Sequence, residues 1–151
     1  MELSRDLREF IELLNSHRVE FLIVGAHALA WYGLPRYTKD IDIFVRVSDE
    51  NAEALAETIK DFGFGSTGLS NSDFLEADQI IQLGMEPHRI DILTGISGVT
   101  WMEAWESREK GTIENVEVFY VGKSVYIKNK LASGRPQDIT DVTRLREIEE
   151  S

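Results

Sequence analysis

The sequence predicts an α/β protein in which helices flank a sheet and a helical tail follows. Two observations support this fold class. Short apolar runs of strand length alternate with segments whose apolar residues recur at helical spacing. From Ser124 onward the chain reads as two helices, separated by the stop and start residues Gly134 and Pro136. Because about 150 residues is an ordinary domain size, the 151 residues are expected to form one domain.

The first half of the chain contains two amphipathic helical patterns. Ser4 is placed to cap the first helix, whose apolar residues recur at helical spacing as far as His17. Ser48, followed by two acidic residues, is typical of a helix start, and Gly63 and Gly65 end that second helix. The other elements expected here are a buried strand at 21–24, a short helix at 26–32 and a strand that ends near Val47.

The second half predicts a pair of strands, a helix and a further strand. The strand-like runs 79–83 and 89–93 are separated by a short segment, so we expect them to pair antiparallel. Residues 101–108 are expected to be helical and 116–121 to form a strand. Residues 66–72 are rich in glycine, serine and asparagine, which predicts either a plain surface connection or a mobile lid.

The pair Asp40 and Asp42 is the most informative feature of the sequence. The apolar residues Ile41, Ile43 and Val45 alternate with it, which is the period of a half-buried strand. Both carboxylates should therefore emerge on one face of the sheet while the apolar residues enter the core. Two carboxylates this close resist ionising together unless a cation lies between them. Hard oxygen ligands of this kind suit Mg²⁺ or Mn²⁺.

Asp91 repeats this pattern downstream, between Ile90 and Ile92. Three carboxylates carried by strands can build a metal site that activates a nucleophile and holds a triphosphate. The alternative is that each aspartate lies on the solvated face of its sheet, as exposed aspartates commonly do.

The segment around Gly25 strengthens the first interpretation. A buried strand, this glycine and a helix follow one another, and such an arrangement points backbone N–H groups at an anion. Many strand–helix units have this form without binding phosphate. Coupled to an Asp-x-Asp strand just downstream, however, it favours a phosphate site.

Composition narrows the range of partners. The net charge of −11 disfavours broad binding to duplex nucleic acid, although a local basic patch and a single RNA 3′ end stay open. The chain has no cysteine, so any metal must be held by oxygen or imidazole. It has no apolar run long enough to cross a bilayer and no pattern of a signal peptide, from which we expect a cytoplasmic protein without a membrane partner.

The motif Gly-x-x-Arg-x-Thr-x-Asp-x-Asp at residues 33–42, preceded by Gly25-Ala26, resembles the nucleotidyltransferase signature of the DNA polymerase β superfamily. Within it, the chain is most similar to small bacterial and archaeal nucleotidyltransferases related to AbiEii-type abortive-infection toxins. The Asp91 strand and a helical tail like 129–142 follow in the expected order, so the resemblance covers nearly the whole chain.

This resemblance implies a nucleotidyltransferase fold with a mixed, mostly antiparallel sheet, flanking helices and a C-terminal helical tail. It also implies transfer of a nucleoside monophosphate from a nucleoside triphosphate to an acceptor hydroxyl. Asp40, Asp42 and Asp91 are the expected catalytic ligands of Mg²⁺ or Mn²⁺, and Lys130 is expected beside the triphosphate. The acceptor implied is an RNA 3′ end, a protein or a small molecule.

Several further residues have both a functional and a structural interpretation. Arg36 and Lys39 either contact phosphate or balance the aspartates, and Arg135 either contacts phosphate or pairs with Asp138. His27 either supports the phosphate turn or packs. The residues expected to bind the nucleotide are Gly25, Ala26, His27, Arg36, Lys39 and Arg135.

Ala26 departs from the superfamily pattern, in which a serine commonly follows the turn glycine. The loss of that hydroxyl removes one ligand contact and leaves a rival hypothesis open. The chain could be a degenerate nucleotidyltransferase-like module that binds or regulates a partner in a toxin–antitoxin pair. For the enzyme, a cognate partner or a homodimer could supply recognition of the acceptor. A metal-dependent phosphohydrolase that activates water is the third hypothesis.

Overall fold

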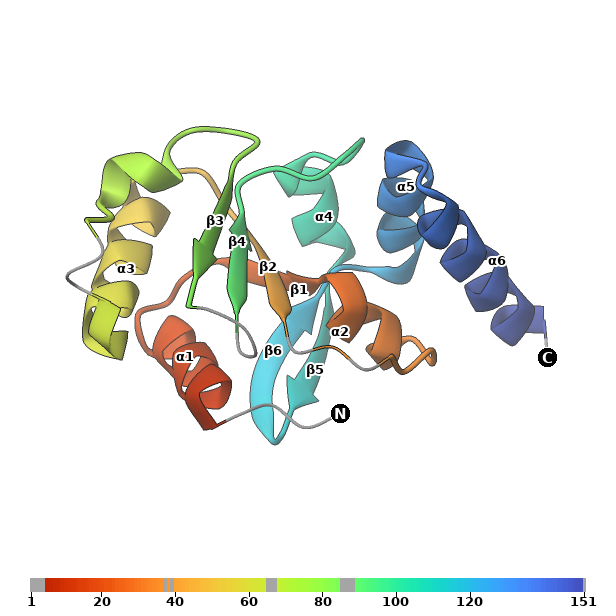
Figure 1. Cartoon of the computed structure of the whole chain (residues 1–151), viewed down its shortest axis with the longest axis horizontal. Helices are drawn as coiled ribbons and strands as arrows, with labels where there is room; N and C mark the ends of the chain where they lie inside the picture. Colours follow the sequence, from red (N-terminus) through yellow and green to blue (C-terminus); the bar gives the residue numbers. More distant parts are fainter. Residues whose placement is uncertain (1–4, 37, 39, 65–67, 85–88, 151) are drawn as a thin grey trace.

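The computed structural model describes residues 5–36, 38, 40–64, 68–84 and 89–150. Six strands and the helices around them follow one another along the chain (Figure 1). The elements are α1 (Arg5–Ser16), β1 (Phe21–Val24), α2 (Gly25–Trp31), β2 (Ile41–Val45), α3 (Asp49–Ile59), the π-helical turn η1 (Lys60–Phe64), the 3-10 helix η2 (Asn71–Phe74), β3 (Ile80–Leu83), β4 (Ile90–Leu93), α4 (Trp101–Ser107), β5 (Glu109–Ile113), β6 (Val116–Tyr120), α5 (Lys123–Ser133) and α6 (Pro136–Glu150).

The strands form one sheet in the order β3-β4-β2-β1-β6-β5. The pairs β1–β2, β3–β4 and β5–β6 are antiparallel, whereas β2–β4 and β1–β6 are parallel. The prediction of a mixed, mostly antiparallel sheet with flanking helices is thereby confirmed. Figure 1 shows α1 and α3 on one side of the sheet and α2, α5 and α6 on the other.

The apolar face of β2 enters the core as its alternation predicts. Ile41, Ile43 and Val45 are almost completely buried, while Asp42 between them is half-buried. The apolar face of α1 is buried as well, and Ser48 caps α3 by accepting a hydrogen bond from the backbone N–H of Asn51. The predicted cap at Ser4 lies outside the described residues.

Strand β5 was not predicted from the sequence. Ile113 is its only buried residue, so the strand lacks the apolar alternation by which strands are recognised. Its pairing with β6 is set by a two-residue turn in which Glu114 and Asn115 both have positive φ, 48° and 70°. Such turns match the twist of the strands they join.

The predicted loop at 66–72 is in part a short helix. Ser70 and Asp73 cap η2 reciprocally, and Phe74 at its end is fully buried. Residues 66 and 67 lie outside the described part of the chain. Among the helices that are described, none is long and apolar enough to cross a membrane.

Candidate active site

Asp42 and Asp91 face each other on neighbouring strands of the sheet. Strands β2 and β4 are parallel, and their register pairs Asp42 directly with Asp91. Burial, and after it the nearby carboxylate of Asp91, together raise the pKa of Asp42 to about 7. The fold therefore holds two carboxyl groups so close that they do not ionise together readily.

Asp40 lies just before β2, and Arg89 links it to Asp91 by forming an ion pair with each carboxylate. One guanidinium nitrogen of Arg89 lies 2.9 Å from Oδ2 of Asp40. Its Nε donates a 2.9 Å hydrogen bond to Oδ1 of Asp91, and the nitrogen that contacts Asp40, Nη2, also donates a 3.3 Å hydrogen bond to Oδ2 of Asp91. The hydroxyl of Thr38 accepts a 2.9 Å hydrogen bond from the backbone N–H of Asp40, which fixes the turn into the strand.

Gly25 brings the backbone against these carboxylates. It begins α2 with φ +67°, a conformation that residues with a side chain rarely adopt. A Cβ atom at this position would lie 2.2 Å from Oδ2 of Asp42. The predicted turn glycine is thus required both for its backbone conformation and for the position of Asp42.

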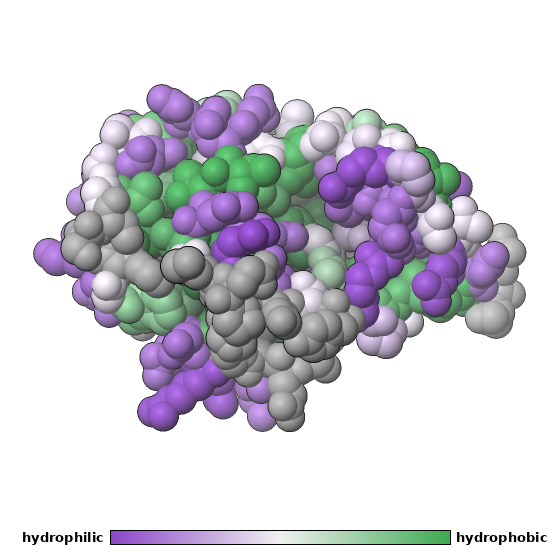
Figure 2. All heavy atoms as spheres, viewed as in Figure 1, coloured by the Kyte–Doolittle hydropathy of each residue, from purple (hydrophilic) through white to green (hydrophobic). Residues whose placement is uncertain are grey.

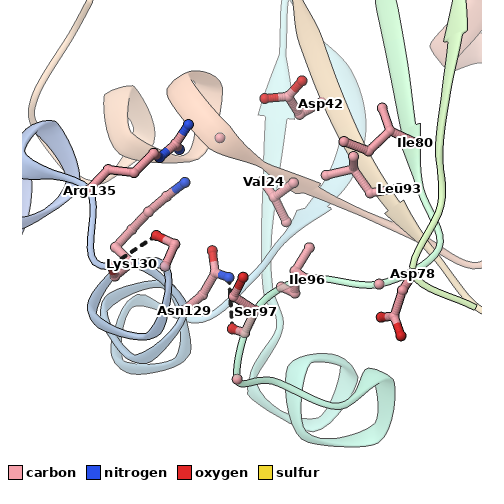
Figure 3. A pocket seen from close by; sticks show the side chains of 14 residues that line it. Val24, Asp42, Asp78, Ile80, Leu93, Ile96, Ser97, Asn129, Lys130 and Arg135 are labelled. Atoms are coloured by element: carbon pink, nitrogen blue, oxygen red, sulfur yellow. Dashed lines mark hydrogen bonds between the residues drawn. The ribbon is translucent and has the colours of Figure 1, made fainter.

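A cleft of 680 Å³ opens beside Gly25 and Asp42, and Lys130 and Arg135 of the helical tail line its opposite wall (Figure 3). Figure 2 shows the molecule hollowed where the hydrophobic surface over β3 and β4 meets the hydrophilic surface over α5. Clefts of this size are typical of small-molecule sites. The other lining residues are Val24, Asp78, Ile80, Leu93, Gly95, Ile96, Ser97, Gly98, Asn129 and Ser133.

Two cations of the site, Arg135 and Arg36, are paired with carboxylates of α6. Arg135 donates a 2.8 Å hydrogen bond to the buried Asp138, and both ends of the Arg36 guanidinium contact the buried Asp141. Burial lowers the pKa of Lys130, although the acidic groups around it oppose this shift. A second cavity of 230 Å³ lies among these groups and also touches Gly25, Ala26 and Asp42.

The other predicted nucleotide contacts are placed differently. Ala26 lines the smaller cavity, whereas the side chain of His27 is buried and lines neither cavity. Burial lowers the pKa of His27 to about 4, so the imidazole is neutral near pH 7. Lys39 lies outside the described residues.

The carboxylates suit a divalent cation in their chemistry, but they are not arranged as a ready coordination shell. In the described part of the chain, no three acidic or histidine side chains are grouped so as to hold a metal ion. Arg89 instead lies against Asp40 and Asp91. However, Oδ1 of Asp40 is buried without a hydrogen-bond partner among the described residues, and such an atom is costly unless a cation or donor reaches it. The donor set therefore fits Mg²⁺ or Mn²⁺ once the guanidinium shifts.

Sequence reasoning missed Arg89 and one wall of the cleft. Arg89 is two residues before Asp91, a spacing that places both on the same face of a strand and could have revealed their contact. The wall formed by Gly95, Ser97 and Asn129 has no such local signal. Asn129 donates a 3.0 Å hydrogen bond to the carbonyl oxygen of Ser97, across 32 positions of sequence.

Comparison with families and solved structures agrees with this architecture. Residues 3–151 match the model of a family described as nucleotidyl transferase of unknown function (DUF2204). No curated protein matches the sequence.

Two solved structures resemble the fold over almost the whole chain. A candidate nucleotidyltransferase from Thermotoga maritima has a TM-score of 0.57 at 16% identity, covering 97% of this chain and 92% of its own. An antigenic nucleotidyltransferase-like protein from Paracoccidioides brasiliensis has a TM-score of 0.56 at 15% identity, covering 98% of this chain and 79% of its own. At such identities the likeness establishes the fold.

Proposed function

The chain belongs to the family of nucleotidyl transferases of unknown function, and from this premise we propose that it transfers a nucleoside monophosphate from a nucleoside triphosphate to an acceptor hydroxyl with the help of Mg²⁺ or Mn²⁺. One observation carries the proposal. Asp42 lines a cleft whose opposite wall carries Lys130 and Arg135, and Asp91 lies in register beside Asp42 on the neighbouring strand. Acidic groups for a metal and basic groups for phosphate thus converge on one site.

Asp40, Asp42 and Asp91 would hold the divalent cation through their carboxylate oxygens. When bound, such an ion neutralises charge on the triphosphate and stabilises the attacking and leaving oxygens. The absence of cysteine is compatible with this all-oxygen donor set.

The basic side chains of Lys130 and Arg135 would neutralise the phosphates of the nucleotide rather than hold the metal. Lys130 lies in the cleft wall beside Tyr126, with its ammonium nitrogen 5.5 Å from the centre of that ring. In this role Lys130 and Arg135 neutralise the β- and γ-phosphates as pyrophosphate leaves. Gly25 lets the backbone approach the phosphates without a side chain between them and Asp42.

The acceptor hydroxyl forms a bond to the α-phosphorus while the bond from that phosphorus to the pyrophosphate oxygen breaks. The hydroxyl proton must leave at the same time. Asp91 is the proposed acceptor of this proton, because it lies directly beside Asp42, which lines the cleft. Phosphoryl transfer of this kind needs positioning and charge stabilisation more than covalent chemistry.

We place the chain within the DNA polymerase β superfamily, near the AbiEii-type toxins, on the strength of its signature at residues 33–42. The proposed acceptors are an RNA 3′ end, a protein or a small molecule. With a net charge of −11, a single nucleic-acid end suits the chain better than a long duplex. A toxin role with a cognate antitoxin is part of this proposal.

Product analysis tests the proposed reaction. The protein is incubated with each nucleoside triphosphate, Mn²⁺ and a mixture of RNA, protein and small hydroxyl acceptors. Transfer releases pyrophosphate and labels an acceptor, and Asp42→Ala should abolish both while the circular dichroism spectrum stays that of the wild type. Release of pyrophosphate with nucleoside monophosphate in water alone would indicate a phosphohydrolase, and unchanged transfer by the variant would refute the assignment.

Ala26 favours one alternative function. It lines the smaller cavity without the hydroxyl that a serine would offer to phosphate. A chain that binds a nucleotide without turning it over would act as a regulatory partner in a toxin–antitoxin pair. Nucleotide binding without transfer to any acceptor, even in an Ala26→Ser variant, would favour this alternative.

A further inference from the structure

Arg89 occupies the position between two of the carboxylates that the proposed function assigns to a metal. Its guanidinium lies 2.9 Å from Asp40 and contacts both oxygens of Asp91, at 2.9 and 3.3 Å. All three side chains are largely shielded from water, with 29%, 22% and 12% of their surfaces exposed for Arg89, Asp40 and Asp91. These contacts therefore have the strength of partly buried, charge-assisted hydrogen bonds.

Resting on the proposed function, we propose that Arg89 is a positioning residue of the metal site: it holds Asp40 and Asp91 as an internal counter-cation, and a divalent ion must displace it. The spacing of Arg89 and Asp91 along the chain explains why these two side chains meet. Arg89 and Asp91 are two residues apart at the start of β4, so their side chains leave the same face of the sheet.

The exchange is possible because the guanidinium satisfies the carboxylates incompletely. Within the part of the chain that the structure describes, Oδ1 of Asp40 has no hydrogen-bond partner although it is buried. A planar guanidinium donates along fixed directions, whereas a small divalent ion carries twice the charge and accepts oxygens from several sides. The ion would therefore gain a contact that Arg89 leaves unmade.

Competition with an internal cation predicts weak binding of metal alone. A divalent ion that enters has to displace three contacts, the two to Asp91 and the one to Asp40. A nucleoside triphosphate supplies further oxygens to the ion, so metal and nucleotide are expected to bind together. Arg89 thus favours loading of the complete metal–nucleotide complex over loading of the free ion.

Calorimetric titration with Mn²⁺ alone, at one fixed pH, tests this role. The Arg89→Gln variant removes the positive charge. Arg89→Lys keeps the charge but loses the bidentate contact with Asp91. Arg46→Gln is the matched control, since Arg46 forms a 3.0 Å ion pair with Glu20 away from these carboxylates. Thermal melting with and without Mn²⁺ gives a second readout that needs no catalysis.

We expect Arg89→Gln to bind Mn²⁺ about tenfold more tightly than the wild type, because a positive charge next to two ligands is gone. Arg89→Lys should fall between the two, and Arg46→Gln should equal the wild type. The melting temperature of Arg89→Gln should fall without metal and recover when Mn²⁺ is added. If Arg89→Gln does not fold, an Arg89→Lys affinity equal to or below that of the wild type overturns the inference.

The two proposals fail in different ways. Mn²⁺ binding by the wild type that is unchanged or weakened in Arg89→Gln overturns the role of Arg89 and leaves the proposed function in place. Absence of Mn²⁺ binding in both proteins overturns the metal site and this inference with it. Tight Mn²⁺ binding by Arg89→Gln without binding of any nucleotide supports the role of Arg89 and contradicts the proposed transfer.

Discussion

Gly25 and Asp42 are so close that a Cβ atom on the glycine would lie 2.2 Å from the carboxylate oxygen Oδ2. The turn that begins α2 and the carboxylate of β2 therefore fit together only if residue 25 has no side chain. This contact links the main-chain turn of the proposed phosphate site to the proposed metal site.

Gly25→Ala should therefore impair both stability and binding. We expect a loss of about 1–3 kcal/mol in the free energy of unfolding, from the positive φ and the clash together. Gly63→Ala is the control, because Gly63 also has positive φ, +102°, but has open space around it. It should lose about 1 kcal/mol and keep wild-type metal binding. Urea unfolding and Mn²⁺ titration of both variants measure this, and equal losses in both would contradict the proposed contact.

Metal binding should depend on pH through Asp42, whose pKa burial and Asp91 raise from an ordinary 3.8 to about 7. Below this value the carboxyl is protonated and cannot bind a cation, so Mn²⁺ affinity should rise by about tenfold per pH unit up to about pH 7 and then level off. Since the folded-state pKa is raised, the metal-free protein should lose stability as pH rises from about 4 to about 7.

Titration with Mn²⁺ from about pH 5.5 to about pH 8 measures this dependence. Asp42→Asn serves as the control and should bind little metal at any pH. The metal-free variant should also be less sensitive to pH in this window than the wild type. A wild-type affinity that does not change with pH would contradict the coupling between Asp42 and Asp91.

Asp141 should be important for attaching α6 to the rest of the molecule. It is 2% exposed and contacts both ends of the Arg36 guanidinium, while Gln137 donates a 3.0 Å hydrogen bond to it. Asp141→Asn leaves Arg36 without its charged partner, and we expect a loss of about 2–4 kcal/mol in stability. The exposed pair Lys110–Glu117 is the comparison, since Lys110→Gln should cost less than about 1 kcal/mol. Equal effects of the two substitutions in denaturant unfolding would contradict this assignment.

The sequence predicts most of the sheet because its buried strands carry their own signal. Ile41 and Ile43 alternate with Asp40 and Asp42, and the structure buries both isoleucines. Strand β5 lacks that signal, since its place is set by pairing with β6 and by close packing of Gly111 against Trp31. Contacts of this kind are made only in the folded chain and leave no periodic pattern.

The same distinction applies to the site. The motif around Asp40 and Asp42 is local, and so is the turn at Gly25, so both could be predicted from the sequence. The pairing of Arg36 with Asp141 joins residues 105 positions apart, and the motif alone offered no reason to choose it over phosphate binding. The contact of Arg89 with Asp91 is local as well, whereas its contact with Asp40 forms only when β2 and β4 lie side by side.

Calorimetric binding of each nucleoside triphosphate with Mg²⁺ or Mn²⁺ tests the central claim most directly, because it needs no knowledge of the acceptor. The wild type is compared with the double variant Asp40→Asn/Asp42→Asn and with Arg46→Gln as a control outside the cleft. We predict metal-dependent binding by the wild type and the control, and none by the double variant. Failure of the wild type to bind any nucleotide, or equal binding by the double variant, would contradict the proposed site.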